Sequence, residues 1–324
     1  MRLRFDESVD AFRAEFLDWL ALHRPDPAAM AAEPPRSTGH LPAWLGRWTR
    51  TMFDAGWLVP GWPPELGGRN AGPIETLVYL EELAKARVPR TSNVQGLGIV
   101  APSIIDYGTP DQVRDFALPI LRGETTACLG MSEPGAGSDL ASLSTRAVLD
   151  GGEWVINGQK VWTSGANDAD FCFLFCRTDP TAPKHRGISV VLVAMDTPGV
   201  RVRPLPEIVH PEEPDLNEVF LDDVRVPAAN LVGELNNGWA MANGSLAHER
   251  GMVWVSAVMG LEESLARLLD EAPGYLAPMG ATERAIVGRP ADAQRAAPGE
   301  PVGEMTDGER IGGGVVVFQD RAKA

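Results

Sequence analysis

Residues 128–139, CLGMSEPGAGSD, form the densest cluster of side chains able to do chemistry. Gly135 and Gly137 flank one small residue, which lets the backbone turn sharply and present consecutive N–H groups. The hydroxyls of Ser132 and Ser138 add hydrogen-bond donors on either side. The segment therefore suits an anion, or a flat heterocycle laid against the chain. The alternative is a glycine-rich turn that only starts a β-barrel.

A second cluster, GQKVWTSGA at residues 158–166, places the aromatic face of Trp162 beside the hydroxyls of Thr163 and Ser164 at the end of an expected strand. Taken alone, this pattern is more typical of a hairpin with a packed tryptophan. Metal chemistry is not indicated, because the five histidines show no ligand spacing such as HExxH.

Composition excludes several classes of protein. The formal net charge is −15 and no basic stripe is visible, so nucleic-acid binding is not expected. No run approaches the roughly 20 apolar residues that a membrane span needs. The first segment carries acids where a signal peptide would be apolar, which predicts a cytoplasmic protein. Three cysteines are an odd number and argue against a disulfide framework.

The hydrophobic period indicates an α+β protein that begins with a helical domain, residues 1–124. Apolar residues at three- and four-residue steps predict helices near residues 5–20, 41–55, 74–86 and 111–121. In the third of these, Leu77, Leu80 and Leu83 are expected to share a face. Residues 60–68, PGWPPELGG, are too rich in proline and glycine for a helix interior.

The period changes in residues 125–233, which predict a β-domain. Runs rich in β-branched and aromatic residues predict strands, bounded by turn sequences such as Asp150-Gly151-Gly152 and Asn157-Gly158. Their spacing indicates a small antiparallel sandwich or barrel. The strand-forming runs are residues 154–156, 171–175, 188–193 and 218–221.

Helical periodicity returns over residues 234–271 and predicts the first helix of a C-terminal helical domain. Residues 272–324 hold 9 glycines and 5 prolines, a density typical of low-complexity segments. A short strand at Val315–Phe318 is the one element we expect there. We interpret residues 272–324 as a divergent tail.

Several motifs together resemble the acyl-CoA dehydrogenase family of flavoproteins. The resemblance covers about residues 40–270, with the motifs in the family's order. They are GWPPELGG (61–68), CLGMSEPGAGSDLASL (128–143), WVINGQKVWTSGANDADFCFLFCRT (154–178), HRGISVVLVAMDTPGV (185–200) and EVFLDDVRVPAANLVGELNNGW (218–239).

The resemblance implies an enzyme that binds FAD between the β-domain and the C-terminal helices. The implied reaction is α,β-dehydrogenation of an acyl-CoA thioester to the trans-2-enoyl-CoA, with electrons passed to an electron-transfer flavoprotein. The implied cofactor-binding residues are Leu129, Met131, Ser132, Gly137, Ser138, Trp162, Thr163 and Ser164. The implied substrate-binding residues are Ser138, His185, Leu246 and Arg250, although His185 alone is more typical of an exposed turn.

The resemblance also implies a catalytic base. In some members the catalytic glutamate lies on the first long helix of the C-terminal domain, just before an arginine. Here that position is Glu249, followed by Arg250, which would anchor the site electrostatically. For an isolated Glu-Arg pair the ordinary interpretation is a solvated helix residue.

The sequence departs from the family at its C-terminal side. Members usually continue as a bundle of long helices, which residues 272–324 do not resemble. The tail is consistent with a truncated or frame-shifted product or with a divergent subunit. Two alternatives therefore stay open beside the dehydrogenase: a catalytically impaired or accessory subunit, and a flavin oxidase or monooxygenase. Apolar residues beyond one stripe of the 234–271 helix predict a homodimer or homotetramer.

Overall fold

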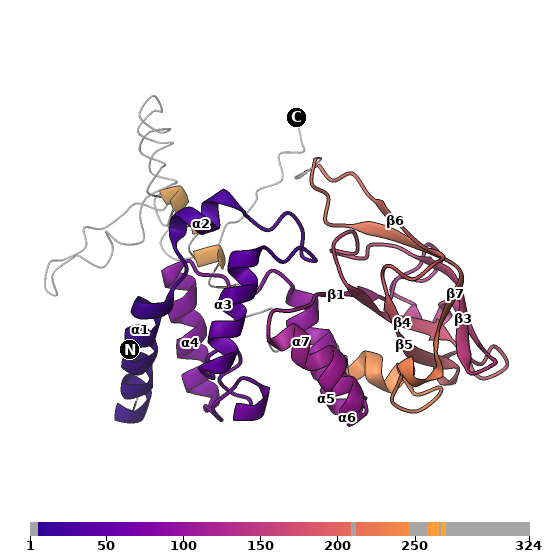
Figure 1. Ribbon diagram of the computed structural model, residues 1–324, viewed down its shortest axis with the longest axis horizontal. Coiled ribbons are helices and arrows are strands. Elements are labelled where there is room, and N and C mark those ends of the chain that lie inside the picture. Colours follow the sequence, from indigo (N-terminus) through magenta and orange to yellow (C-terminus); the bar gives the residue numbers. More distant parts are fainter. Residues whose placement is uncertain are drawn as a thin grey trace, which may run out of the picture. The chain divides into compact units, whose positions relative to one another are not determined.

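The computed structural model describes residues 6–208 and 212–245, together with residues 258, 260–262, 264, 265 and 267–269. The elements below belong to the compact unit of residues 1–261. Their labels follow Figure 1.

The N-terminal part is helical, as predicted. Each long helix begins near an expected start, and Thr109 caps α6 through a bond from the Gln112 N–H to its hydroxyl. The helices are α1 (Glu7–His23), α2 (Pro27–Ala32), α3 (Ala43–Asp54), α4 (Pro73–Ala86), α5 (Ala101–Tyr107), α6 (Pro110–Gln112) and α7 (Leu118–Leu121). Short 3₁₀ or π turns lie at Pro64–Leu66, Gly96–Val100 and Val113–Ala117.

An aromatic cluster fills the helical core. The rings of Phe16, Trp57 and Tyr79 pack with centroids 4.8–6.2 Å apart, joining α1 and α4 to the loop after α3. The buried face of α4 differs from the expected one: Leu77 is exposed, whereas Tyr79 and Leu83 are buried. The helix was predicted correctly, but its buried face consists of Val78, Tyr79, Glu82 and Leu83, because Tyr79 packs into the aromatic cluster.

One helical stretch was missed. Residues 96–107 are helical although they contain Gly96, Gly98 and Pro102, which disfavour helix in isolation. A side chain at Gly96 would collide with Asn93, whose Oδ1 would lie 1.7 Å from the added Cβ. The stretch is helical because burial among its neighbours outweighs its weak intrinsic propensity.

The second part is an eight-stranded sheet with the order β6-β7-β3-β2-β4-β5-β8, and β1 pairs with β4. Most pairs are antiparallel, but β1 and β2 both run parallel to β4, which the sequence did not predict. The strands are β1 (Ala127–Gly130), β2 (Arg146–Asp150), β3 (Glu153–Lys160), β4 (Phe171–Arg177), β5 (Ile188–Ala194), β6 (Val200–Pro204), β7 (Asn217–Pro227) and β8 (Leu231–Val232).

The expected turn at Asn157-Gly158 is wrong. Both residues lie inside β3, where the pairing with β7 shifts register between Ile156 and Gly158. A side chain at Gly158 would meet the backbone of Thr145, whose Cα would lie 2.7 Å from the added Cβ. The glycine therefore permits a bulge and a close approach rather than a hairpin.

Strand β4 joins two hydrophobic cores, because it is buried on both faces. Phe171, Phe173 and Phe175 belong to the core that contains the helices, whereas Cys172 and Leu174 face a second core within the sheet. This alternation is the two-residue period of a strand. The helical part and the sheet thus share one hydrophobic core along β4.

The chain leaves the sheet through residues 238–245, which are helical. Gly238 packs against β5, and a Cβ on it would lie 2.8 Å from the Ile188 carbonyl oxygen. Ser245 shares a buried 2.8 Å hydrogen bond with Ser103 of α5. The tail and its expected strand at Val315–Phe318 lie outside the described residues. No helix of the described part is both long enough and apolar enough to cross a membrane.

Candidate functional site

The glycine-rich segment leaves the sheet at the end of β1. Gly130 lies so close to β4 that a Cβ there would stand 2.8 Å from the Cys172 sulfur. After Met131 and Ser132, Glu133 and Ala136 exchange two backbone hydrogen bonds, each 3.0 Å long, which close a tight turn. The sharp turn that the sequence predicted is therefore present.

The glycines of this turn have a different role from the one expected. Neither Gly135 nor Gly137 has a positive φ, so the turn does not depend on their backbone freedom. A Cβ on either would meet no atom within 4 Å. What their bare backbone provides is an open outer face, which a ligand can approach closely.

A buried ion pair holds the beginning of the turn. Lys160 Nζ lies 2.8 Å from Glu133 Oε1, and the two side chains are 0% and 4% exposed. Burial alone would raise the pKa of Glu133, but the Lys160 charge and four hydrogen bonds outweigh burial and lower this pKa to about 2. Glu133 is therefore a carboxylate at neutral pH.

The same junction brings the two sequence clusters together. The Val161 N–H donates to the Ser132 carbonyl at 2.9 Å, so Ser132 lies directly beside the residue before Trp162. Trp162 has a φ of 60° and its side chain is 61% exposed. It is not the packed hairpin tryptophan that its sequence context alone would favour. Its indole is available to a flat ligand.

Hydrogen-bond donors at this edge lack protein partners. Within the described residues, neither the N–H nor the hydroxyl of Ser132 is bonded, nor is the hydroxyl of Ser164. Thr163 is 1% exposed and its hydroxyl oxygen also has no partner. Leaving a buried polar group unpaired is costly, and a ligand bound at this edge would pair the Thr163 hydroxyl. An exposed indole on Trp162, together with donors on Ser132 and on the nearby Ser164, fits a planar heterocycle whose edge carries carbonyl oxygens, as a flavin's does.

The loop between α2 and α3 holds the turn that follows Trp162 through hydrogen bonds and close packing, and we call these contacts the clasp. The Thr38 N–H and hydroxyl both donate to Asp215, at 2.6 and 2.8 Å, and the Ser37 hydroxyl donates to Asp168 at 2.7 Å. Gly39 lies against Gly165, whose carbonyl oxygen would be 2.0 Å from a Cβ on Gly39. The loop between α2 and α3 therefore fixes the backbone next to Ser164.

The other end of the glycine-rich segment is exposed. Ser138 lies at the surface, and Asp139 forms a 2.8 Å ion pair with Lys184 in which both side chains are at least half exposed. Next to Lys184, the exposed His185 packs its ring edge-on against Trp239, with centroids 4.6 Å apart. The structure thus brings the Ser138 and His185 regions together, as a shared ligand would require.

Three of the expected site residues, Leu246, Glu249 and Arg250, lie outside the described residues. The described helix ends at Ser245, immediately before them. Leu129 and Met131 are partly buried beside the shared core, and Gly137 is exposed.

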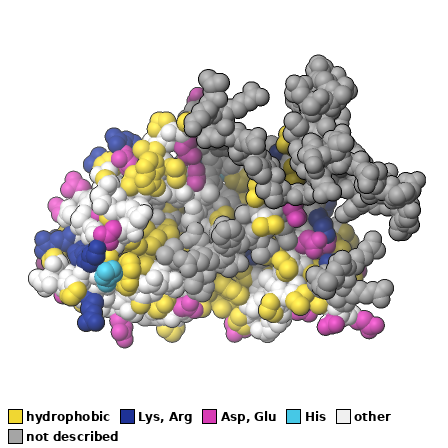
Figure 2. All heavy atoms as spheres, turned by 180° about the vertical axis from the view of Figure 1, so that it is seen from behind, with side chains coloured by type: hydrophobic (Ala, Val, Ile, Leu, Met, Phe, Trp, Pro, Cys, Tyr) yellow, Lys and Arg dark blue, Asp and Glu magenta, His cyan; other side chains and the backbone are white. Residues whose placement is uncertain are grey.

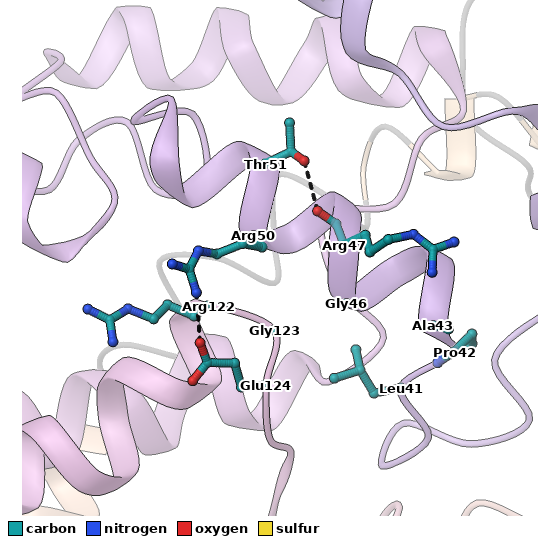
Figure 3. A pocket seen from close by; sticks show the side chains of 10 residues that line it. All are labelled: Leu41, Pro42, Ala43, Gly46, Arg47, Arg50, Thr51, Arg122, Gly123 and Glu124. Carbon is teal, nitrogen blue, oxygen red and sulfur yellow. Dashed lines mark hydrogen bonds and ion pairs between the residues drawn. The ribbon is translucent and has the colours of Figure 1, made fainter.

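A separate hollow of about 570 Å³ lies between α3 and the segment after α7. Arg50 extends toward Glu124, whereas Arg47 and Arg122 extend in opposite directions (Figure 3). The three guanidinium groups do not converge, so they do not form an anion site. On the face shown in Figure 2, acidic side chains are scattered among basic ones, and no basic stripe crosses its described part.

Sequence reasoning missed two supports of the site. Glu133 and Lys160 lie in two different quoted motifs, and this pair of opposite charges was the available signal. The clasp gave no such signal, because Ser37 and Thr38 are separated from Asp168 and Asp215 by more than 100 residues.

Comparison with known proteins matches both parts of the chain. The acyl-CoA dehydrogenase N-terminal domain matches residues 7–124, and the acyl-CoA dehydrogenase middle domain matches residues 128–224. Acyl-CoA dehydrogenase IpdE1 of Mycobacterium tuberculosis is 39% identical over 82% of this chain and 69% of its own length. Acyl-CoA dehydrogenase FadE34 of the same organism is 48% identical over 68% of this chain. This chain spans only 30% of FadE34.

Solved structures are similar as well. A structure described as the Tcur3481-Tcur3483 steroid ACAD superposes with a TM-score of 0.68 at 32% identity, over 91% of this chain and 72% of that one. The ChsE4-ChsE5 complex from Mycobacterium tuberculosis gives a TM-score of 0.62 at 36% identity, over 76% of this chain and 62% of that one.

Proposed function

Because this chain belongs to the acyl-CoA dehydrogenase family, we propose that it acts in FAD-dependent α,β-dehydrogenation of an acyl-CoA thioester to the trans-2-enoyl-CoA. The observation that carries the proposal is the open edge at which Ser132, bonded to Val161, adjoins the exposed Trp162. FAD, when bound, supplies the acceptor for the hydride that leaves the β-carbon.

The residues of the open edge hold and orient the cofactor in this proposal. The Ser132 N–H and the Ser132 and Ser164 hydroxyls would donate to the edge of a bound flavin, whose negative charge such donors stabilise. Trp162 would lie against the ring. Leu129, Met131, Gly137 and Thr163 complete the cofactor-binding surface.

The acyl-CoA binds at the exposed end of the glycine-rich segment, through Ser138 and His185, together with Leu246. Glu249 removes the α-proton of the thioester. That proton is only weakly acidic, so its removal needs a stronger base than an ordinary carboxylate. Shielding a carboxyl group from water raises the pKa of that group and makes it such a base. Arg250 anchors the site electrostatically. The electrons pass to an electron-transfer flavoprotein.

Glu249 provides the test of this function. When FAD-loaded protein is mixed anaerobically with acyl-CoA, flavin absorbance should bleach, and Glu249→Gln should slow bleaching at least about a hundredfold. Glu262→Gln, at an exposed position, is the matched control and should leave the rate unchanged. A Glu249→Gln variant that bleaches as fast as the wild type removes Glu249 from the mechanism. An FAD-loaded wild type that acyl-CoA does not bleach supports the accessory-subunit alternative.

A second proposal concerns assembly with another dehydrogenase chain. Two of the similar structures are named for pairs of chains, and one of these is called a steroid ACAD. In this chain Leu265 and Leu268 are 52% and 60% exposed and lie three residues apart, a spacing typical of one helix face. We therefore propose that this face packs against a second acyl-CoA dehydrogenase chain, and that steroid thioesters are the first substrates to test.

Co-purification and light scattering together distinguish the forms of assembly. If the chain forms a heteromer, it should co-purify in a fixed ratio with a second acyl-CoA dehydrogenase chain from the same organism. Self-association would give a homodimer or homotetramer of this chain alone. A clean monomer at micromolar concentration, unchanged by the second chain, contradicts both.

A further inference from the structure

The Glu133–Lys160 ion pair is almost completely buried. Burying two charges is expensive, and well-packed apolar residues of similar volume often stabilise a protein as well or better. Here both charges lie next to the open edge, with Lys160 Nζ 2.8 Å from Glu133 and 3.0 Å from the Met131 carbonyl oxygen. The pair therefore contacts the backbone immediately before Ser132.

The contact with Met131 fixes the direction of the next N–H. Within one trans peptide, the C=O and the N–H point in opposite directions. Because the Met131 carbonyl accepts from Lys160, the Ser132 N–H must point away from Lys160. The Ser132 carbonyl is held in turn by the Val161 N–H at 2.9 Å. The peptides on both sides of Ser132 are thus fixed, while its own N–H is left without a partner in the described residues.

Glu133 is held independently of Lys160. Its carboxylate also accepts from the Ser144 N–H and hydroxyl and from the Thr145 N–H, at 2.6–2.9 Å. Replacing Lys160 by an apolar residue of similar length therefore leaves the carboxylate with three donors. It removes the bond to the Met131 carbonyl, so the two roles of Lys160 can be separated experimentally.

We propose that Lys160 is a positioning residue for the cofactor, and this inference rests on the proposed function. Lys160 turns the Ser132 N–H toward the flavin edge and holds it there before FAD arrives. Such preorganisation strengthens binding because the cofactor does not have to order the loop itself. The same fixed donor stabilises negative charge on the reduced flavin.

The test compares Lys160→Met with Lys184→Met, which removes the exposed ion pair at the other end of the same segment. The readouts are FAD affinity, measured by flavin fluorescence, and the flavin midpoint potential. Lys160→Met should bind FAD at least tenfold more weakly, with a more negative potential, and Lys184→Met should match the wild type. A Lys160→Met variant with wild-type affinity and potential, even one that melts earlier, overturns the inference.

Two further measurements cover the other outcomes. If Lys160→Met does not fold, the neutral variant Glu133→Gln/Lys160→Met replaces it, with the same expected losses. In the wild type, hydrogen exchange of the Ser132 amide should be measurable without FAD and slow when FAD is added. An amide already protected without FAD overturns the inference. If the wild type binds no FAD, the proposed function is overturned as well. If the wild type binds FAD but Lys160→Met shows no loss of affinity or potential, only the role of Lys160 is overturned.

Discussion

The two ends of the glycine-rich segment are fastened by ion pairs of opposite character. At Glu133 the pair is buried and tied to the backbone through three hydrogen bonds, whereas at Asp139 both partners are exposed. The first pair fixes the edge proposed for a rigid ring. The second leaves Ser138 on an exposed surface, which suits a long and flexible ligand. We call the end at Glu133, with its buried ion pair, the fixed half of the site, and the end at Ser138, with its exposed ion pair, the adjustable half.

The largest expected effect comes from Glu133→Gln. It leaves the Lys160 ammonium buried without a counter-charge, which should lower the free energy of unfolding by about 3–5 kcal/mol. Asp139→Asn is the matched control and should change it by less than about 1 kcal/mol, because exposed pairs contribute little. Urea unfolding measures both. Equal effects of the two substitutions would show that the ends are fastened alike.

Acid should reveal the same contrast. An ordinary glutamate has a pKa of about 4.3, and that of Glu133 is lowered to about 2 in the folded chain. The pair's contribution is therefore complete above about pH 4.3 and is lost as pH falls toward 2, a loss of about 3 kcal/mol. Unfolding free energies between pH 6 and 2.5 should fall more steeply for the wild type than for Glu133→Gln. Parallel curves would contradict the assignment.

Gly39→Ala tests the second support of the fixed half. An added Cβ would lie 2.0 Å from the Gly165 carbonyl oxygen, so the clasp must shift. We expect a loss of about 1–3 kcal/mol in unfolding free energy, together with weaker FAD binding. Gly135→Ala, where no atom lies within 4 Å of the new Cβ, should be neutral for stability. A Gly39→Ala variant that binds FAD normally would separate the clasp from the cofactor edge.

The smallest expected effect lies in the adjustable half. Ser138→Ala should weaken acyl-CoA binding by about 0.5–1.5 kcal/mol, the contribution of one hydrogen bond, and leave FAD content unchanged. Isothermal titration with an acyl-CoA measures the first, and flavin absorbance the second. A variant that loses FAD but keeps thioester affinity would place Ser138 in the fixed half.

Local signals predicted much of the fold. Strands β3, β4, β5 and β7 were expected because their side chains are strongly apolar or alternate. Strand β2 was missed because Ala147 is its one buried residue, so it carries almost no pattern. Strand β8 has only two residues. Elements stabilised by their neighbours leave little trace in their own sequence.

The candidate site also has features that local sequence predicts and features that depend on distant contacts. Ser132, Trp162 and Ser138 could be proposed from sequence because each lies inside a short, distinctive motif. That Ser132 adjoins Trp162 depends on a bond between residues 132 and 161, which no local pattern encodes. The clasp through Thr38 and Asp215 joins parts of the chain that are still further apart. Sequence therefore predicted the candidate residues, and the fold supplies the contacts that bring them together.

Titration of the purified full chain with FAD tests the central claim most directly. If the edge around Ser132 and Trp162 holds a flavin, absorbance and fluorescence should change saturably to one FAD per chain. Ser132→Ala/Ser164→Ala should bind at least several-fold more weakly, because two hydroxyl donors are lost. A folded chain that takes up no FAD, or a double variant that binds as tightly as the wild type, would contradict the account.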